Sequence, residues 1–252
     1  MTRIFRLIAK LKNIAVSLFG GKLIDPIEVY YDVRENYVYP ILSKSGNSSL
    51  KLTLIKKYNL DFEAKFPDIH LLEPSEYTSG NVERIFFWKP LEYVAFCKGK
   101  NIRVVIRNPY ERYYSFYLGV KSERNRIYRY PSETHRIFGI TKNTSFQKLL
   151  LLVCFIPDSF ADRHFRSQSY YLRYGVKSAV REIEVHDLVS YLRKENDDEE
   201  KERSSHLNKS NRGIPENILN ELIRSKKFQN RYSEDLDLYR ISTILPSPSP
   251  KN

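Results

Sequence analysis

The spacing of hydrophobic positions changes several times along the chain, and each change predicts a switch between strand and helix. Residues 37–42 (Tyr-Val-Tyr-Pro-Ile-Leu) form a short apolar and aromatic run, which predicts a buried strand. Residues 43–49 are small and polar. Leu50, Leu54 and Tyr58 then recur at helical spacing, so a helix is expected to begin near residue 48. The order predicted here is strand, polar loop, helix.

A second strand-to-helix unit follows in the middle of the chain. Residues 101–106 (Asn-Ile-Arg-Val-Val-Ile) are rich in β-branched side chains and predict a buried strand. Asn108 is a favourable N-cap, Pro109 suits the first helical position, and Glu111 has capping-box spacing. The other expected elements are strands at 83–88 and 180–185 and helices at 90–97, 146–155, 187–194, 215–224 and 228–239.

The chain length of 252 residues suits one domain with appendages. Residues 1–21 combine an apolar helical stripe with Arg and Lys, which predicts an amphipathic helix that either lies on a membrane surface or docks on the domain. Residues 22–240 are assigned to the domain, with 22–36 as a linker containing a short extended piece. Residues 122–142 are expected to form a basic loop. Residues 241–252 predict a disordered tail.

Composition narrows the class of partner. Apolar residues make up 41% of the chain and aromatic residues 13%, which indicates a globular protein, and the net charge of +12 favours an anionic partner. Nucleic acid, an acidic membrane surface, a phosphorylated nucleotide and an acidic glycan all satisfy that charge. Cys97 and Cys154 have no zinc spacing and no disulfide framework, which favours a reducing compartment. We therefore expect a cytoplasmic protein, with peripheral membrane contact through residues 1–21 as an open alternative.

The polar loop after the first strand has the composition of an anion site. Lys44 supplies a full positive charge, and Gly46 and Asn47 are residue types that adopt positive φ and let the backbone wrap around an oxyanion. The first N–H groups of the following helix have no partners within the helix and point toward the loop. Hydroxyl donors come from Ser45, Ser48 and Ser49. The nucleotide-triphosphate P-loop is excluded because Lys44 precedes the only glycine.

The second unit places a further cation beside such an edge. Arg107 directly follows the strand at 101–106, and ligands of open α/β sheets bind beyond the carboxyl ends of the strands. Its guanidinium is a planar fork that suits a phosphate, and Ser115, about two turns into the next helix, adds one donor. Read singly, Arg107 could be a surface ion pair, and Ser115 could bond its own helix backbone.

Both units resemble motifs of the sulfotransferases. The run Lys44-Ser-Gly-Asn-Ser-Ser-Leu50 resembles their 5′-phosphosulfate loop, commonly Pro-Lys-Thr-Gly-x-Thr-Ser-Leu, with Ser43 in place of the proline. The run Arg107-Asn-Pro-Tyr-Glu-Arg-x-x-Ser115 resembles their 3′-phosphate motif, usually Arg-Asp-Pro-x-x-Arg-x-x-Ser. Supporting similarities to carbohydrate sulfotransferases lie at 162–169 (a His-Trp-x-x-Gln segment with Phe165 for Trp), 182–188, 206–210 and 232–236.

The resemblance implies a fold and a reaction. The fold would be α/β, a P-loop-like three-layer α/β/α domain with a central, mostly parallel sheet. The co-substrate would be 3′-phosphoadenosine 5′-phosphosulfate, the acceptor a carbohydrate hydroxyl, and neither metal nor nucleic acid would be needed. The residues that would bind the co-substrate are Lys44, Ser45, Gly46, Asn47, Ser48 and Ser49 at the phosphosulfate, Arg107 and Ser115 at the 3′-phosphate, and, more weakly, Lys209 and Ser210.

Catalysis would need charge stabilisation on the leaving oxygen and a general base for the acceptor hydroxyl. Lys44 is assigned the first role. His70 is the first candidate for the base because it lies between the two motifs, and His164 is the second because its surrounding motif matches. Glu73 and Glu76 are further alternatives. A different class remains open, a basic nucleic-acid-binding or other phosphonucleotide-binding α/β protein, since the charge and 33 Phe plus Tyr would suit it.

Overall fold

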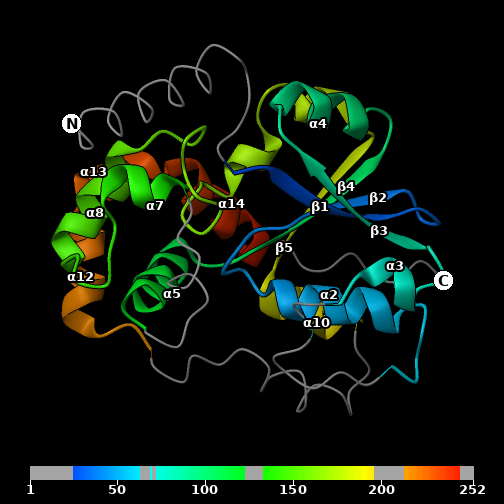
Figure 1. Cartoon of the computed structure of the whole chain (residues 1–252), viewed down its shortest axis with the longest axis horizontal. Helices are drawn as coiled ribbons and strands as arrows, with labels where there is room; N and C mark the ends of the chain where they lie inside the picture. Colours follow the sequence, from blue (N-terminus) through cyan, green and yellow to red (C-terminus); the bar gives the residue numbers. More distant parts are fainter. Residues whose placement is uncertain (1–24, 63–68, 70–71, 123–132, 196–212, 245–252) are drawn as a thin grey trace, which may run out of the picture.

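The computed structural model describes residues 25–62, 69, 72–122, 133–195 and 213–244. These residues form an open five-stranded sheet in the order β3-β1-β2-β4-β5 (Figure 1). The strands are β1 (Ile27–Asp32), β2 (Tyr37–Pro40), β3 (Val82–Phe87), β4 (Asn101–Ile106) and β5 (Glu182–Asp187). Strand β1 is antiparallel to both of its neighbours, whereas β2, β4 and β5 are parallel. Four strands thus share one direction and β1 opposes them.

Strand β1 corrects the expectation of a linker at residues 22–36. It occupies a central position in the sheet, and Val29 is completely buried. Two acidic residues among apolar and aromatic ones, Glu28 and Asp32, hid this strand, because a carboxylate is costly to bury alone. The structure resolves that cost by placing Arg84 of β3 at 2.5 Å from the Glu28 carboxylate. The ion partner comes from 56 residues away, so the local pattern gave no sign of it.

Helices cover both faces of the sheet. On one face lie α2 (Asn47–Lys56) and α10 (Leu188–Glu195), whose apolar side chains pack with residues of β1, β2 and β4 (Figure 1). On the other face, α4 (Pro90–Cys97) and α9 (Val176–Ala179) contact each other, beside the 3₁₀ turn η2 (Ser169–Leu172). The α/β class is therefore confirmed, and the sheet, expected to be mostly parallel, has two parallel and two antiparallel strand pairings.

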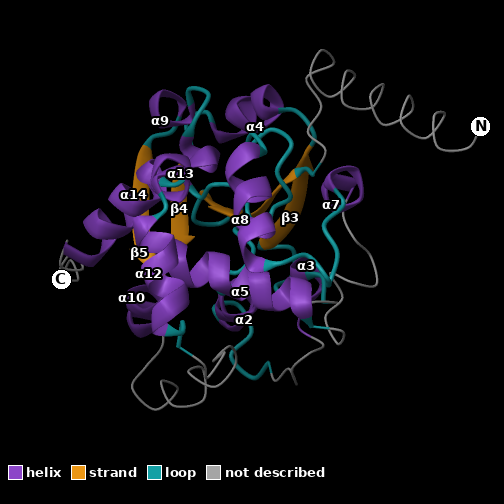
Figure 2. Cartoon of the chain, turned by 90° about the vertical axis from the view of Figure 1, so that its left-hand side faces the viewer, coloured by secondary structure: helices purple, strands orange, loops and turns teal. Residues whose placement is uncertain are grey.

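A helical lobe packs beside the sheet around its own apolar cluster (Figure 2). It contains α5 (Pro109–Lys121), α8 (Phe146–Phe155), α12 (Glu216–Arg224) and α13 (Lys226–Arg231). Short helices α3 (Pro74–Tyr77) and α7 (Glu133–Phe138) complete the set with α14 (Ser233–Ile244), which contacts β5. Helix α7 lies within the segment that the sequence assigns to a loop.

Several boundaries agree with the sequence and others move. The ranges predicted at 90–97, 101–106 and 146–155 are confirmed residue for residue. The helix predicted at 228–239 is two helices instead, because Tyr232 leaves helical geometry at φ −114° and its hydroxyl donates to the Phe165 carbonyl at 2.7 Å. Helix α14 runs to Ile244, past the predicted domain end at 240. The strand predicted at 180–185 begins two residues later, at Glu182.

The amphipathic helix predicted at 1–21 lies outside the described residues. Of the disordered tail predicted at 241–252, residues 241–244 belong to α14 instead, and residues 245–252 lie outside those described. Within the described part of the chain, no helix combines the length and the apolar character that a bilayer crossing requires.

Candidate functional site

The loop between β2 and α2, residues 43–49, is built around two left-handed backbone positions. Lys44 has φ +67° and Gly46 has φ +84°, and Ser45 N donates to the Leu42 carbonyl at 3.1 Å. Gly46 is the N-cap of α2, so no side chain caps this helix end. The first-turn amides of α2, from Asn47 onward, therefore begin where the loop closes, as the composition predicts.

The glycine in this loop has two separate causes. Its positive φ favours a residue without a β-carbon. In addition, a β-carbon at Gly46 would come within 2.6 Å of one methyl group of Leu188 and closer still to the other. Helix α10 therefore packs directly on the backbone of the loop. Substitution of Gly46 would disturb the loop and the α2–α10 packing together.

The second candidate cation, Arg107, leaves the end of β4 at the junction with α5, residues 107–109. Its Nη1 donates to the Lys44 carbonyl at 3.3 Å, and its Nε donates to the Glu111 carboxylate at 3.1 Å. Asn108 caps α5 as expected, since its side chain accepts from Tyr110 N at 3.0 Å. The junction and the loop are thus in direct contact, although they lie 63 residues apart in sequence.

Gln168 ties the loop to the junction. Its Oε1 accepts from Ser45 Oγ at 3.0 Å and from the Arg107 backbone N at 2.9 Å, and its Nε2 donates to the Arg107 carbonyl at 2.9 Å. This side chain is completely buried. Asp235 of α14 in turn accepts from the backbone N of Gln168 at 2.7 Å and of Ser169 at 2.8 Å. One buried amide therefore fixes the relative position of both candidate anion-binding segments.

Arg112, the second arginine of the 3′-phosphate resemblance, has a supporting place. Its guanidinium is buried, and it donates to the Ser43 carbonyl through Nε at 3.0 Å and to the Arg163 carbonyl through Nη2 at 3.0 Å. It thereby anchors the start of the loop to the segment that carries His164. A ligand would meet Arg107 rather than Arg112.

His164 is held by a buried carboxylate. Its Nδ1 lies 2.5 Å from Asp162 Oδ1, and its backbone N donates to the same oxygen at 2.7 Å. The Asp162 side chain is 3% exposed, whereas that of His164 is 21% exposed. With the proton on Nδ1 donated to Asp162, Nε2 is the nitrogen that can accept a proton. This is the geometry of an oriented general base.

The side chain of Lys44 is close enough to Arg107 and Asp162 for their charges to affect its pKa. Burial lowers the pKa of Lys44, the positive charge of Arg107 lowers it further, and the negative charge of Asp162 raises it in part. The two cations therefore repel each other across a partly dry site. An anion between them would relieve that repulsion, because each cation would gain a counter-charge.

The remaining candidates divide into described and undescribed residues. Ser115 is half-buried on α5, and Ser48 and Ser49 are buried in the first turn of α2. Glu73 lies 3.9 Å from Arg84, in the ion cluster of Glu28. His70, Lys209 and Ser210 lie outside the described residues. Sequence reasoning missed the roles of Asp162 and Asp235, although both fall inside the stretches at 162–169 and 232–236 that carry the weaker similarities.

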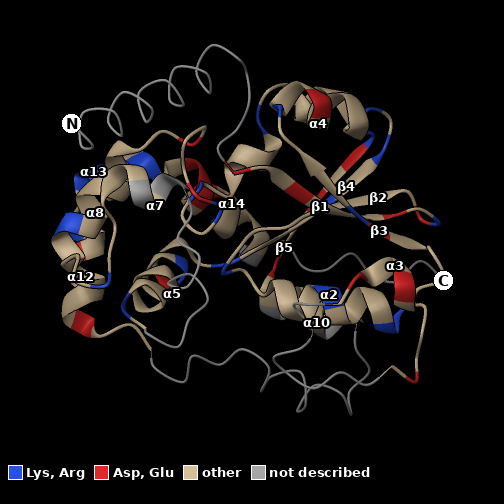
Figure 3. Ribbon diagram, in the orientation of Figure 1, with Lys and Arg blue, Asp and Glu red and all other residues tan. Residues whose placement is uncertain are grey.

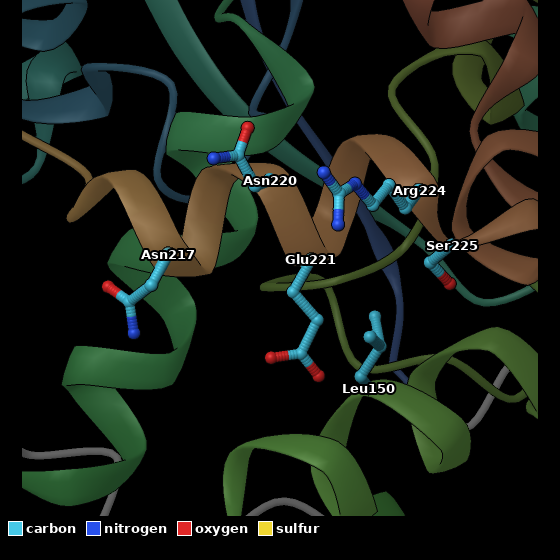
Figure 4. Close-up of a pocket in the computed structure, with 6 residues that line it drawn as sticks. All are labelled: Leu150, Asn217, Asn220, Glu221, Arg224 and Ser225. Atoms are coloured by element: carbon cyan, nitrogen blue, oxygen red, sulfur yellow. The ribbon is translucent and has the colours of Figure 1, made fainter.

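Other site types find less support in the described residues. No group of three or more His, Cys, Asp or Glu side chains gathers as a metal site there. A pocket of about 620 Å³ lies between α8 and α12 (Figure 4), and none of its lining residues belongs to the loop 43–49 or the junction 107–109. Those lining residues are Leu150, Asn217, Asn220, Glu221, Arg224 and Ser225.

Comparison with protein-family models, with curated proteins and with solved structures finds no match for this chain. The class of this protein is therefore defined by its fold and its candidate site alone. It is a mixed α/β protein in which Lys44, just before the N-terminus of α2, lies beside Arg107 at the end of β4.

Proposed function

We propose that this protein is a sulfotransferase that moves a sulfuryl group from 3′-phosphoadenosine 5′-phosphosulfate to a carbohydrate hydroxyl, on a P-loop-like three-layer α/β/α fold. The observation that carries the proposal is the bridge made by Gln168 between Ser45 and Arg107. A nucleotide with phosphate groups at both ends needs two anion-binding segments within its own length. The loop 43–49 and the junction 107–109 meet that requirement, since Arg107 contacts Lys44 directly.

Each segment would hold one end of the nucleotide. At the loop, the ammonium of Lys44 and the amides of the first turn of α2 suit the 5′-phosphosulfate. At the junction, the guanidinium of Arg107 and the hydroxyl of Ser115 suit the 3′-phosphate. Burial and then the charge of Arg107 lower the pKa of Lys44, and a bound anion would offset both effects, which supports this assignment.

The reaction is a displacement at sulfur. The acceptor oxygen forms a bond to sulfur as the bond from sulfur to the 5′-phosphate oxygen breaks, and adenosine 3′,5′-bisphosphate leaves. Lys44 would stabilise the negative charge that develops on that leaving oxygen. His164 would take the hydroxyl proton on Nε2 while Asp162 holds its Nδ1. The contact with Asp162 favours His164 over His70 as the base.

Binding of adenosine 3′,5′-bisphosphate tests the proposal without knowledge of the acceptor. Isothermal titration calorimetry should give a dissociation constant that rises at least about tenfold in Lys44→Ala and in Arg107→Ala, because each loses a charge-assisted contact. Lys148→Ala and Arg240→Ala are matched controls on exposed helix positions and should bind like the wild type. Wild-type affinity in both site variants, with the fold intact by circular dichroism, would refute the assignment.

Turnover then tests the base. With sulfate donor and a panel of glycans and glycolipids read by mass spectrometry, His164→Ala should lower kcat by roughly 10²-fold or more and leave the bisphosphate affinity unchanged. Asp162→Asn should lower kcat and change its pH profile, because the imidazole would lose its orienting carboxylate. Full turnover in His164→Ala would move the base elsewhere, with His70 as the next variant.

The nucleic-acid alternative makes a different prediction. Figure 3 shows Lys and Arg dispersed over the described helices and loops and interleaved with Asp and Glu, and Arg84, Arg103 and Arg231 are each paired with a carboxylate. Retention on single-stranded DNA that falls steeply with salt and ignores adenosine 3′,5′-bisphosphate would favour that alternative. Release from an immobilised bisphosphate by free nucleotide would favour the sulfotransferase.

A further inference from the structure

Strand β3 forms one edge of the sheet. Its six residues pair with β1 on one side, from Ile27 opposite Phe87 to Asp32 opposite Val82, and within the described part of the chain no strand pairs with its other side. Phe86 is 46% exposed and the following Trp88 is 51% exposed. An edge strand with large apolar side chains in water is a template for another strand.

The backbone groups that face outward can be assigned. Val33 N donates to the Asn81 carbonyl at 2.9 Å, which fixes the phase of the β1–β3 ladder. Because hydrogen-bonded pairs alternate in an antiparallel ladder, the odd residues of β3 bond toward β1 and the even ones point away. Val82 N donates to Thr78 Oγ1 at 3.0 Å, so the outward groups farther along belong to residues 84, 86 and 88. Lys89 is still extended, with φ −120° and ψ 135°.

One antiparallel register makes this edge complementary to itself. With Phe86 opposite Phe86 of a second copy, the outward-facing residues 84 and 88 also lie opposite each other, and Glu83 lies opposite Lys89. Both charged residues are exposed. The arginine at 84, which pairs with Glu28 and lies over the Phe86 ring of its own strand at 4.9 Å, would have the indole at 88 opposite it as a further aromatic neighbour. The neighbouring registers give less favourable pairs. One places the two Arg84 side chains opposite each other, and another leaves Glu83 opposite Phe87. A third places Arg84 opposite Pro90, which has no N–H to donate.

We propose that two copies of this chain associate through β3 in that register and extend the sheet across a twofold axis. Each contact occurs twice, as in any isologous interface. The two Glu83–Lys89 pairs would lie on the sheet face of α4, because Ile85 and Phe87 pack there. The aromatic cluster of Phe86 and Trp88 would lie on the opposite face. A contact this short gives a transient dimer, with a dissociation constant in roughly the micromolar range at low salt.

The charge pairs distinguish a second copy from a lipid surface. A bilayer would bind the apolar side chains of Phe86 and Trp88, but it would form no favourable interaction with the acidic Glu83 on the same strand. A second copy would contact all of these residues. Glu83 and Lys89 lie at equal distances in sequence on either side of Phe86, so an antiparallel twofold pairing centred on Phe86 brings them opposite each other.

A charge exchange tests the register. In sedimentation equilibrium of the full chain at low salt, Glu83→Lys should weaken dimerisation by roughly tenfold, since it places like charges opposite each other twice. Lys89→Glu should do the same, although it also meets Glu92 of its own helix. The double variant Glu83→Lys with Lys89→Glu should recover the wild-type constant. Glu182→Lys, exposed on the other edge strand β5, is the matched control and should change nothing.

The proposal fails on any of three results. The wild type could remain monomeric at about 0.5 mM, far above a micromolar constant. Alternatively, the single variants could dimerise as tightly as the wild type, or the double variant could fail to recover. A monomeric wild type that sediments with anionic vesicles, and loses this in Phe86→Ser and Trp88→Ser, would assign the face to lipid instead.

Discussion

Replacement of Gln168 by leucine is the sharpest test of how the two candidate anion-binding segments, the loop 43–49 and the junction 107–109, are held together. The substitution keeps a side chain of similar size but removes three hydrogen bonds, to Ser45 Oγ and to both backbone groups of Arg107. At a net value of about 1 kcal/mol each, their loss should destabilise the protein by about 3 kcal/mol. The Gln168 side chain is completely buried, so leucine would leave Ser45 and the Arg107 backbone without this partner in the interior.

The assay has two readouts. Urea denaturation should give the loss in free energy of unfolding, and calorimetry should show that the affinity for adenosine 3′,5′-bisphosphate falls more than about tenfold as the loop and junction separate. Gln229→Leu is the matched control. Its Nε2 donates to Tyr110 Oη at 2.9 Å and to two carbonyls of α12 at 3.3 Å, all in the helical lobe. That variant should lose stability but keep its affinity.

The reasoning would be refuted if Gln168→Leu bound the bisphosphate like the wild type while the stability fell as expected. The bridge would then contribute to folding alone, and the two segments would keep their positions without it. Equal losses of affinity in Gln168→Leu and Gln229→Leu would also count against it, because general loosening of the fold would explain both.

Two further predictions follow from the same region. Gly46→Ala should destabilise by about 1 kcal/mol from its positive φ plus about 1–3 kcal/mol from overpacking against Leu188, and a double-mutant cycle with Leu188→Ala should show coupling; additive effects would contradict the contact. Burial and the charge of Arg84 lower the pKa of Lys51 from 10.5 to about 8, so the unfolded chain holds the extra proton between those values. Stability relative to Lys51→Met should therefore rise from about pH 8 to 10.5, and a flat difference in urea denaturation would contradict this.

The local sequence pattern was sufficient to predict an element where most of the residues that mark it lie within that element. The strand at 101–106 ends in three β-branched residues, which predict it although its Arg103 is paired with Glu184 of β5. The helix at 146–155 has a buried face and a serine cap, Ser145, which accepts from Lys148 N. Strand β1 was not predicted because its acidic residues pair with residues of other segments, Glu28 with Arg84 and Asp32 with Lys57. The apolar positions of β1 alone predict only a short extended segment within a linker.

The candidate site shows the same division. The loop residues Lys44 and Gly46 stand only two positions apart in sequence, so the composition of an anion site is visible there. The contacts that position them are distant, since Gln168 lies 123 residues from Ser45 and 61 from Arg107. No local periodicity marks a glutamine as a bridge. Only the fold shows which polar side chain the loop closes on.

The carboxylate of Asp235 has a consequence for biosynthesis. It holds the backbone of Gln168 across 67 residues, and it belongs to α14, the last helix in the described part of the chain. At about 5–20 residues per second, a ribosome needs on the order of 10 s to reach it after the glutamine has been made. During that interval the nascent chain carries the loop 43–49 and the junction 107–109 without the carboxylate that holds Gln168, so the candidate site is complete only after α14 has been made.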